Sequence, residues 1–149
     1  MAHAAEWEWE VQSWIRNDAR KECSGSLDER VLVADGVEPS CLAAVAAHAR
    51  CDATYAAWAR EQVLWEGPVR ILRAVAVDLR HQGKGLGREA MERALDDIVD
   101  REAEESTLVL ALIHERNERS QRMAGSLDFE LAPFPCEGAP GMHFWFADV

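Results

Sequence analysis

Short apolar runs, separated by polar segments and turn residues, set the organisation of the chain. The apolar residues of segment 5–21 recur at helical spacing and predict an amphipathic opening helix. Residues 30–34 predict a strand that stops at a turn beginning with Asp35. Residues 41–48 are small and apolar, and their pattern fits a buried strand or a helix equally well.

The middle of the chain predicts a strand, a loop and a helix in succession. Segment 52–67 carries three large aromatic residues among alanines, which favours a short helix or an ordered loop. Residues 69–77 are rich in β-branched side chains and predict a central strand. The next helix begins within a glycine-rich loop and runs through Ile98, with Asp96 and Asp97 expected toward solvent.

The last third of the chain predicts a second central strand and a strand pair at the end. The run 107–113 is almost entirely apolar, as expected of a strand covered on both faces. It should lie parallel to the first central strand, because a strand–helix–strand crossover places the glycine loop at the carboxyl edge of the sheet. A polar helix over 117–125 and strands at 129–131 and 142–147 complete a single predicted domain, residues 1–149.

Composition agrees with one domain and indicates its environment. With 149 residues, 48% of them apolar, the chain can bury one core. Its apolar runs fall short of the roughly 20 residues that cross a bilayer, and the N-terminus lacks the pattern of a secretory signal, so we expect a cytoplasmic protein. The four cysteines form no CxxC pair, and we expect no metal; a zinc site at Cys41, Cys51 and His48 is the weaker alternative.

The net charge of −11 changes which partners are expected. Nonspecific nucleic-acid binding depends on Lys and Arg neutralising phosphates, so an acidic chain disfavours it. An acidic surface would attract a protonated amine substrate. Acidic surfaces also serve solubility alone, so the charge by itself does not identify a substrate.

The glycine-rich loop, residues 82–87 (Gln-Gly-Lys-Gly-Leu-Gly), is the clearest candidate for binding chemistry. Glycines between a strand and a helix let backbone N–H groups turn toward a phosphate, and the helix start adds partial positive charge. Lys84 and Arg88 add full charges. A Walker loop needs Ser or Thr where Gly85 stands, and a dinucleotide loop should follow its strand directly; Glu115 after the next strand keeps the dinucleotide alternative open.

Segment 73–87, RAVAVDLRHQGKGLG, resembles the acetyl-CoA motif R/Q-x-x-G-x-G/A of the GNAT acyltransferases. Arg80, Gly83 and Gly85 fill its three fixed places. The resemblance continues into a following strand, an Asn that opens the next helix and a Phe after it. It implies an α/β (α+β) fold with a mixed, mainly antiparallel sheet, flanking helices and a V-shaped split between the two central strands. The acyl-CoA-binding core would then be residues 69–129, with 1–27 as an N-terminal helical segment.

The resemblance also implies how acetyl-CoA is held. In such proteins, backbone groups of the first central strand bond to the pantetheine arm as an added strand would, and the loop holds the pyrophosphate. Asn117 and Ser120 match the helix that contacts pantetheine, although Asn is also a favoured N-cap. The expected coenzyme-binding residues are Val75, Ala76, Val77, Arg80, Gln82, Gly83, Lys84, Gly85, Leu86, Gly87, Arg88, Asn117 and Ser120.

The chain departs from the family at three catalytic or structural positions. Many members place a Tyr seven residues after the Asn to protonate the leaving thiolate, and here that residue is Ala124. Asp128 replaces the usual Gly before Phe129, and Leu112 stands where some members carry a Glu. These differences leave the catalytic acid unassigned.

The remaining candidates for chemistry come from the strand ends and from the aromatic segment. His114 points to the same side of the strand as Leu112, two residues earlier, and is the candidate base. Ser120 is a second candidate catalytic residue. Glu66 could activate the amine through water, although it could equally be a surface charge. The candidate acceptor wall, which ordinary core packing would explain as well, is Tyr55, Trp58 and Trp65.

The expected function is transfer of an acetyl group from acetyl-CoA to an amine of a small molecule or peptide by direct attack. A catalytically silent CoA-binding or regulatory module is one alternative, because the usual Tyr is missing. A toxin-like enzyme that acetylates aminoacyl-tRNA is another, against which the acidic charge argues. Pairing of the C-terminal strands into a homodimer is left open.

Overall fold

A computed structural model describes residues 30–35, 42–51, 53–103 and 105–149. The helix expected at 5–21, within the N-terminal helical segment 1–27, lies outside these residues. No helix in the described ranges is long and apolar enough to cross a membrane.

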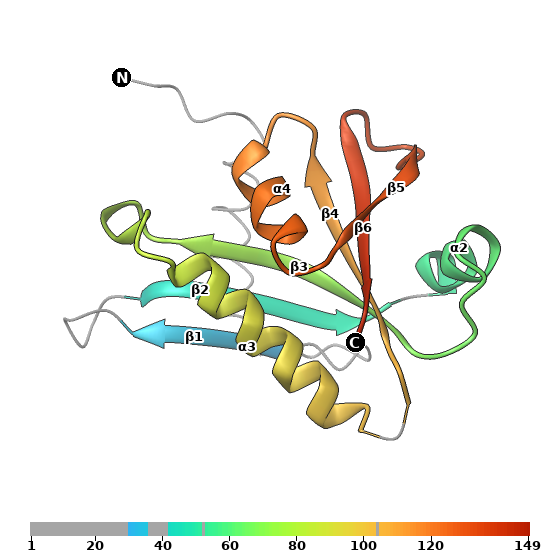
Figure 1. Ribbon diagram of the computed structural model, residues 1–149, viewed down its shortest axis with the longest axis horizontal. Coiled ribbons are helices and arrows are strands. Elements are labelled where there is room, and N and C mark those ends of the chain that lie inside the picture. Colours follow the sequence, from blue (N-terminus) through green and yellow to red (C-terminus); the bar gives the residue numbers. More distant parts are fainter. Residues whose placement is uncertain (1–29, 36–41, 52, 104) are drawn as a thin grey trace.

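In the described part of the chain, six strands form one sheet in the order β1-β2-β3-β4-β6-β5 (Figure 1). Of the neighbouring pairs among these six strands, only β3 and β4 are parallel, and the others are antiparallel. The prediction of a mixed, mainly antiparallel sheet is therefore confirmed. The strands are β1 (Arg30–Asp35), β2 (Leu42–Arg50), β3 (Val69–Val77), β4 (Leu108–His114), β5 (Glu130–Pro135) and β6 (Met142–Asp148).

The helices cover opposite faces of this sheet. They are α2 (Ala53–Gln62), the short 3-10 helix η1 (Leu79–His81), α3 (Leu86–Arg101) and α4 (Glu118–Gly125). Along β4, Val109 and Ala111 pack with buried residues of α3 and α4, whereas Leu108 and Leu110 pack with Ala59 of α2. Because side chains alternate along a strand, α3 and α4 cover one face and α2 covers the other.

The structure decides between two alternatives for one segment and lengthens a strand predicted from sequence. Residues 41–48, whose pattern left two alternatives, contribute the strand β2. β5 does not end at residue 131 but continues through Pro133 and Pro135. The edge position of β5 explains this, because a proline lacks the N–H that a central strand must donate to its neighbour.

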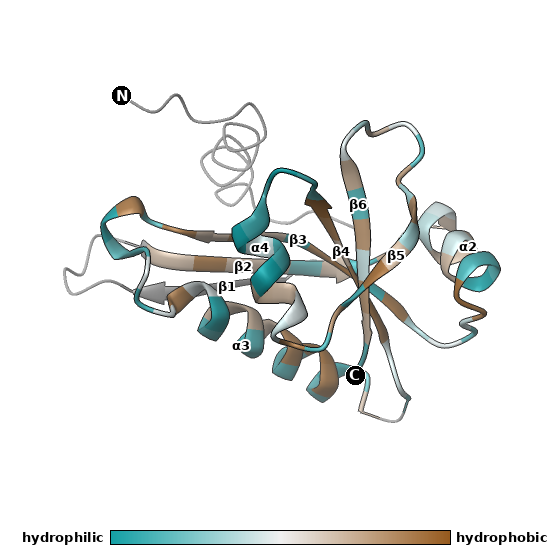
Figure 2. Cartoon of the chain, turned by 45° about the horizontal axis from the view of Figure 1, so that its top comes forward, coloured by the Kyte–Doolittle hydropathy of each residue, from teal (hydrophilic) through white to brown (hydrophobic). Residues whose placement is uncertain are grey.

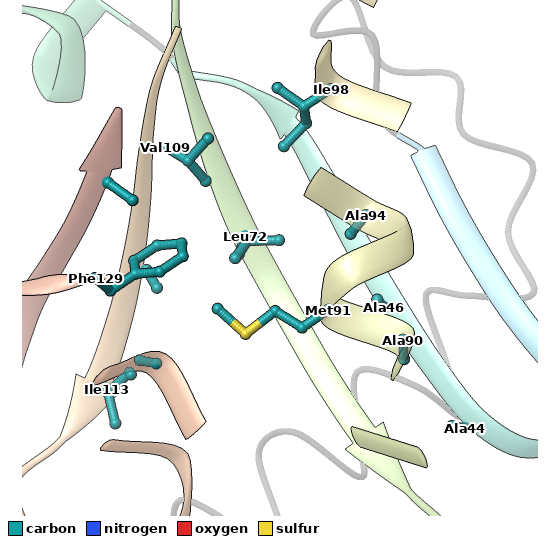
Figure 3. Close-up of a cluster of buried hydrophobic side chains, with 13 residues drawn as sticks. Ala44, Ala46, Leu72, Ala90, Met91, Ala94, Ile98, Val109, Ile113 and Phe129 are labelled. Atoms are coloured by element: carbon teal, nitrogen blue, oxygen red, sulfur yellow. The ribbon is translucent and has the colours of Figure 1, made fainter. Parts of the chain in front are cut away.

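The first core cluster fastens α3 to the centre of the sheet (Figure 3). Met91 lies toward Leu72 of β3, and Phe129 closes the cluster from the chain leaving α4. Ala94 of α3 and Ala46 of β2 are fully buried, and their small side chains let the helix lie close to the strand. This packing fixes the position of the glycine loop, since α3 begins there.

The second core cluster holds the aromatic residues of α2. The rings of Trp58 and Phe144 have their centroids 4.5 Å apart, and Tyr55 meets Phe144 edge-on at 5.6 Å. Trp65 is tied down separately, because its Nε1 donates to the Pro68 carbonyl at 3.0 Å. Aromatic pairs of this geometry add to the burial energy of a core.

A buried polar network ties the end of α3 to β2 and β3. His48 and Arg70 are fully buried. Arg70 Nη1 donates to His48 Nδ1 at 3.2 Å, so the proton of the neutral imidazole is on Nε2, which donates to Asp97 Oδ2 at 2.9 Å. Arg70 also pairs with Glu102 at 3.0 Å. The expectation that Asp97 faces solvent is therefore wrong: its carboxylate is partly buried and engaged by His48 and Arg101.

Burial lowers the pKa of His48 below its ordinary value of 6.5, although the bond to Asp97 opposes the shift. The unfolded chain then binds a proton that the folded chain does not, so stability declines as pH falls below about 6.5. One proton sets a limit of about 1.4 kcal/mol per pH unit. Urea unfolding at pH 7.5 and 5.5 should show a smaller loss in His48→Gln than in the native protein. His81→Gln, outside the network, should keep the native dependence; equal losses in all three would exclude His48 as the source.

Asp128, in the position where the family usually has Gly, has a left-handed backbone with φ 62°. Only Gly adopts this conformation without strain, and Asp tolerates it better than most residues. Asp128→Gly should therefore raise the free energy of unfolding by up to about 1 kcal/mol, and Asp128→Val should lower it by about 1–2 kcal/mol. Thermal and urea unfolding measure both changes. If Asp128→Val left the free energy of unfolding unchanged, the backbone at this turn would have relaxed to accommodate valine.

Candidate functional site

The two central strands separate in the middle of the sheet. Parallel pairing between β3 and β4 starts at Val69↔Leu108 and stops at Leu72↔Ala111. The outer edges stay paired much further, since β2 follows β3 up to Val77 and β6 follows β4 up to His114. β3 and β4 therefore diverge like the arms of a V, which Figure 1 shows with α4 lying in the angle. The predicted V-shaped split is confirmed.

Hydrogen bonds at the end of β3 show which backbone groups face this split. Asp78 N–H donates to the Ala43 carbonyl at 2.9 Å, so the backbone of Asp78 faces β2. Backbone groups alternate sides along a regular strand, so those of Val75 and Val77 face the split while Ala76 faces β2. The three residues expected to bind pantetheine thus divide into two that present N–H and C=O groups to the split and one that does not.

The same reasoning applies to β4 on the other side. Leu108 N–H donates to the Pro68 carbonyl at 3.0 Å, so the backbone of Leu108 faces β3. Leu112 and His114 follow at even spacing and therefore face the split as well. In the described part of the chain, no strand pairs with these inner edges of residues 73–77 and 112–114. An extended ligand carrying amides could pair with both edges.

The glycine loop lies at the open end of the split, directly after β3 and η1. Gly83 and Gly85 have φ of 77° and 82°, which only glycine adopts without strain. A Cβ on either residue would meet no atom of the described residues within 4 Å. These two glycines are therefore required by backbone conformation, and the space beside them is open to a ligand.

Gly85 is also the N-cap of α3, where no side chain of a described residue caps the helix. The first bond of the helix runs from Glu89 N–H to the Gly85 carbonyl at 3.0 Å. The N–H groups of residues 86–88 therefore have no partner within the helix. Together with the helix dipole, they form a site suited to an anion.

Gly87 has a different role from the two loop glycines. A Cβ there would lie 3.3 Å from Val77 Cγ2 and 3.6 Å from Met123 Sδ. The first turn of α3 thus packs tightly against the end of β3 and against α4. Leu86 joins the edge of the first core cluster, which fixes the helix start further.

The cationic side chains of the loop are mostly paired. Arg80 binds both carboxylate oxygens of Asp78, each at 3.0 Å, and this holds the pKa of Asp78 at about 2. Arg88 pairs with Glu92 at 2.8 Å, one turn further along α3. Lys84 Nζ reaches the Arg80 carbonyl at 3.5 Å. A phosphate at the loop would therefore meet two arginines already held by carboxylates.

Asn117 and Ser120 lie at the start of α4. Asn117 is the N-cap, and its Oδ1 accepts from Ser120 N–H at 3.1 Å. The N-cap alternative noted from sequence is therefore observed. The Asn117 NH2 group is the part of the side chain that could still reach a ligand, and Ser120 is partly buried beside it.

His114 is held at the end of β4 in one tautomer. Arg116 N–H donates to His114 Nδ1 at 3.1 Å, so a neutral imidazole carries its proton on Nε2. The ring also lies against Gly141, where an added Cβ would come within 2.9 Å of Nε2. In this arrangement Nε2–H is a donor. The side chain shares its face of β4 with Leu112 and the aromatic cluster of α2.

The structure does not bring Glu66 together with His114. Glu66 is exposed and precedes β3, at the end where β3 and β4 still pair. His114 ends β4, and the seven residues of that strand span about 20 Å at the usual rise per residue. The aromatic residues expected to line an acceptor site, Tyr55, Trp58 and Trp65, belong to the second core cluster at the α2 side.

Ala124, at the position of the family's usual Tyr, is fully buried in the first core cluster. A tyrosine there would displace packed neighbours, so this site has no room for the usual acid without rearrangement.

Two residues of α4 were missed by sequence reasoning. Gln121 Nε2 donates to the carbonyls of His114 at 3.2 Å and Glu115 at 2.8 Å, and Arg119 Nη1 donates to Gln82 Oε1 at 2.6 Å. Both lie in a helix that the sequence marks only as polar, and no local spacing distinguishes them.

Metal binding has no support in the described ranges, which contain no group of three or more His, Cys, Asp or Glu residues placed to hold an ion. His48, a member of the zinc alternative, is bound by Arg70 and Asp97. Cys51 and Cys136 form no disulfide within the described part of the chain, and Cys41 lies outside the described residues.

Gly141→Ala tests the contact that positions His114. Gly141 and Gly138 have similar left-handed φ values, 76° and 78°, but only a Cβ at Gly141 would meet the imidazole. Both alanine variants should lose about 1 kcal/mol of stability to backbone strain, and Gly141→Ala should lose more. It alone should shift the His114 ring resonances in NMR spectra. Equal shifts in the two variants would contradict the contact.

Comparison with known proteins places these features in a family. Residues 2–129 match the acetyltransferase (GNAT) family. A search of curated protein sequences finds no significant match.

Solved structures with the same fold include acetyltransferases of low sequence identity. NAA60 of Arabidopsis thaliana, in complex with acetyl-CoA, aligns with a TM-score of 0.63 and 10% identity over 95% of this chain and 92% of that one. YncA of Salmonella typhimurium, solved with its cofactor acetyl-CoA, aligns with a TM-score of 0.56 and 18% identity over 99% and 75%.

A ribosomal-protein alanine N-acetyltransferase of Escherichia coli aligns with a TM-score of 0.52 and 18% identity, over 75% of this chain and 64% of that one. The chain thus spans slightly less than two thirds of that enzyme. At these identities the likeness shows the fold alone, whereas the family match covers most of the sequence. With its split sheet and glycine loop, the chain belongs to the GNAT family of acetyltransferases.

Proposed function

We propose that this protein transfers an acetyl group from acetyl-CoA to a primary amine of a small molecule or peptide. One observation carries the proposal: the split between β3 and β4 opens at the same end of the sheet as the glycine loop. A ligand with an anionic end and an amide-bearing arm fits both features at once. Acetyl-CoA has its diphosphate and its pantetheine amides in that order.

The described residues support a division of the coenzyme site into two parts. Backbone groups of Val75, Val77 and Leu112 line the split, where the pantetheine amides would pair as an added strand does. The N–H groups of residues 86–88 would take the diphosphate, with Lys84 adding charge. Asn117 would reach the arm through its NH2 group.

The reaction is direct attack. The neutral amine nitrogen forms a bond to the thioester carbonyl carbon, the C–S bond breaks, and the amine gives up one proton while the coenzyme thiolate gains one. We propose that His114 donates a hydrogen bond from Nε2–H to the developing thiolate, which differs from the base role expected from sequence. Water then carries the proton released by the amine to the sulfur. The Ser120 hydroxyl, on α4, is a second group that could donate a hydrogen bond to the thiolate.

The acceptor would approach from the face of the sheet that carries α2. His114 projects to that face, and the diphosphate loop belongs to the face of α3. Tyr55 and Trp58 would form one apolar wall there. The exposed position of Glu66, beyond the paired part of the strands, gives its base role no support.

A catalytically silent coenzyme-binding module is the second candidate, favoured by one observation. The residue in the place of the usual catalytic Tyr is the core residue Ala124. Acetylation of aminoacyl-tRNA is disfavoured by the net charge of −11.

Calorimetry with acetyl-CoA, followed by chromatographic detection of free CoA with a panel of amines, tests the proposal. Native protein should bind acetyl-CoA, and Gly85→Asp should weaken binding at least about 10-fold, because a carboxylate then occupies the anion site. Gly138→Asp is the matched control, with a similar φ and equally open space, and should bind normally. Folded native protein that binds no acetyl-CoA would rule out an acetyltransferase; binding without amine-dependent CoA release would leave the silent module.

A further inference from the structure

A chain of side-chain bonds spans the mouth of the split from α4 to β3. Arg119 Nη1 donates to Gln82 Oε1 at 2.6 Å, and Gln82 Nε2 donates to the Val77 carbonyl at 3.4 Å. That carbonyl faces the split, by the alternation set at Asp78. The Gln82 side chain therefore occupies a backbone group that the pantetheine arm would use. We name the Arg119–Gln82–Val77 chain of bonds the clasp.

The opposite edge of the split is held by the same helix. Gln121 Nε2 donates to the His114 carbonyl, which also faces the split, and to the Glu115 carbonyl. α4 is thus bonded to both edges; Figure 1 shows it in the angle of β3 and β4, and Figure 2 shows it over one face of the sheet. The clasp differs from the Gln121 bonds in one respect: it passes through the loop that would bind the diphosphate.

Charge distinguishes Arg119 from the other arginines around the loop. Arg80, Arg88 and Arg122 each pair with a carboxylate, those of Asp78, Glu92 and Glu118 respectively. Among the described residues, the guanidinium of Arg119 bonds to the neutral amide of Gln82. An arginine gains attraction when a phosphate oxygen replaces a neutral acceptor, because the two opposite charges attract and the guanidinium can donate two bonds to the phosphate. The arginines that are paired with carboxylates have no such gain.

We propose that Arg119 binds a phosphate group of the coenzyme and that the clasp opens when it does so. The phosphate takes the place of Gln82 Oε1 on the guanidinium, the Gln82 side chain turns away, and the Val77 carbonyl becomes available to a pantetheine N–H. Binding of the charged end thereby prepares the edge of the split for the arm. The inference rests on the proposed function, since it needs acetyl-CoA as the ligand.

Arg119→Gln tests the phosphate contact, with Arg122→Gln as the matched control one turn away. Calorimetry should show acetyl-CoA affinity falling about 10- to 100-fold in Arg119→Gln, as for loss of a bond to a charged group, and unchanged in Arg122→Gln. If Arg119→Gln also weakens the binding of dephospho-CoA by the same factor, the contact is with the diphosphate. If native protein and Arg119→Gln bind dephospho-CoA equally well, the contact is with the 3′-phosphate. Native affinity in Arg119→Gln, in a protein whose circular dichroism is unchanged, would overturn the proposal.

Substitution of Gln82 tests the clasp itself by stopped-flow association of CoA. Gln82→Glu creates an ion pair with Arg119 and should slow association at least about 10-fold, because a carboxylate holds the guanidinium more strongly than a neutral amide does. Gln82→Ala removes the clasp and should associate at least as fast as native protein. Slow association in Gln82→Ala would overturn the clasp. If native protein binds no acetyl-CoA, the proposed function fails; if it binds and the Arg119 and Gln82 variants behave as native, only this inference fails.

Discussion

The separation of β3 from β4 after Leu72↔Ala111 is the constraint on which the rest of the molecule depends. Each strand stays bonded along its outer edge, β3 to β2 and β4 to β6, so the divergence exposes only the inner edges. Backbone N–H and C=O groups are costly to leave without partners away from water. Two glutamine side chains satisfy part of this need at the mouth of the split: Gln82 of the glycine loop bonds to the Val77 carbonyl, and Gln121 of α4 bonds to the His114 carbonyl. Among the described residues, no strand pairs with the deeper backbone groups on Val75 and Leu112.

α3 carries this constraint to the glycine loop because the helix is anchored at both ends. Its first turn is wedged by Gly87 against Val77 and Met123, and Met91 packs into the central cluster. Its last turn is held through Asp97 by the buried His48. A helix fixed in this way cannot slide along the sheet, so its N-terminal amides keep their place relative to the edges of the split. The core packing of α3 therefore also fixes the position of the glycine loop.

The polar residues fall into two groups with different roles. His48 bonds to both Arg70 and Asp97, and the charges of Arg70 and Asp97 are paired with Glu102 and Arg101, so removal of one partner leaves an uncompensated group in or near the core. Arg119 and Lys84, at the loop, bond only to neutral acceptors among the described residues. The first group stabilises the fold, and the second is available for exchange with a charged ligand. The acidic remainder of the surface makes this small cationic region the natural place for an anion.

The sequence by itself determined the central strands, the helix after the glycine loop and the loop's need for glycine, because periodicity and positive φ are local properties. It left residues 41–48 open, since a run of alanines has no period, and it ended β5 early, since only an edge position tolerates Pro133 and Pro135. Tertiary structure alone decided that His48 meets Asp97, that Glu66 and His114 lie apart, and that Arg119 reaches Gln82. Those contacts join residues tens of positions apart, and their partners are set by how strands and helices pack, which no local pattern records.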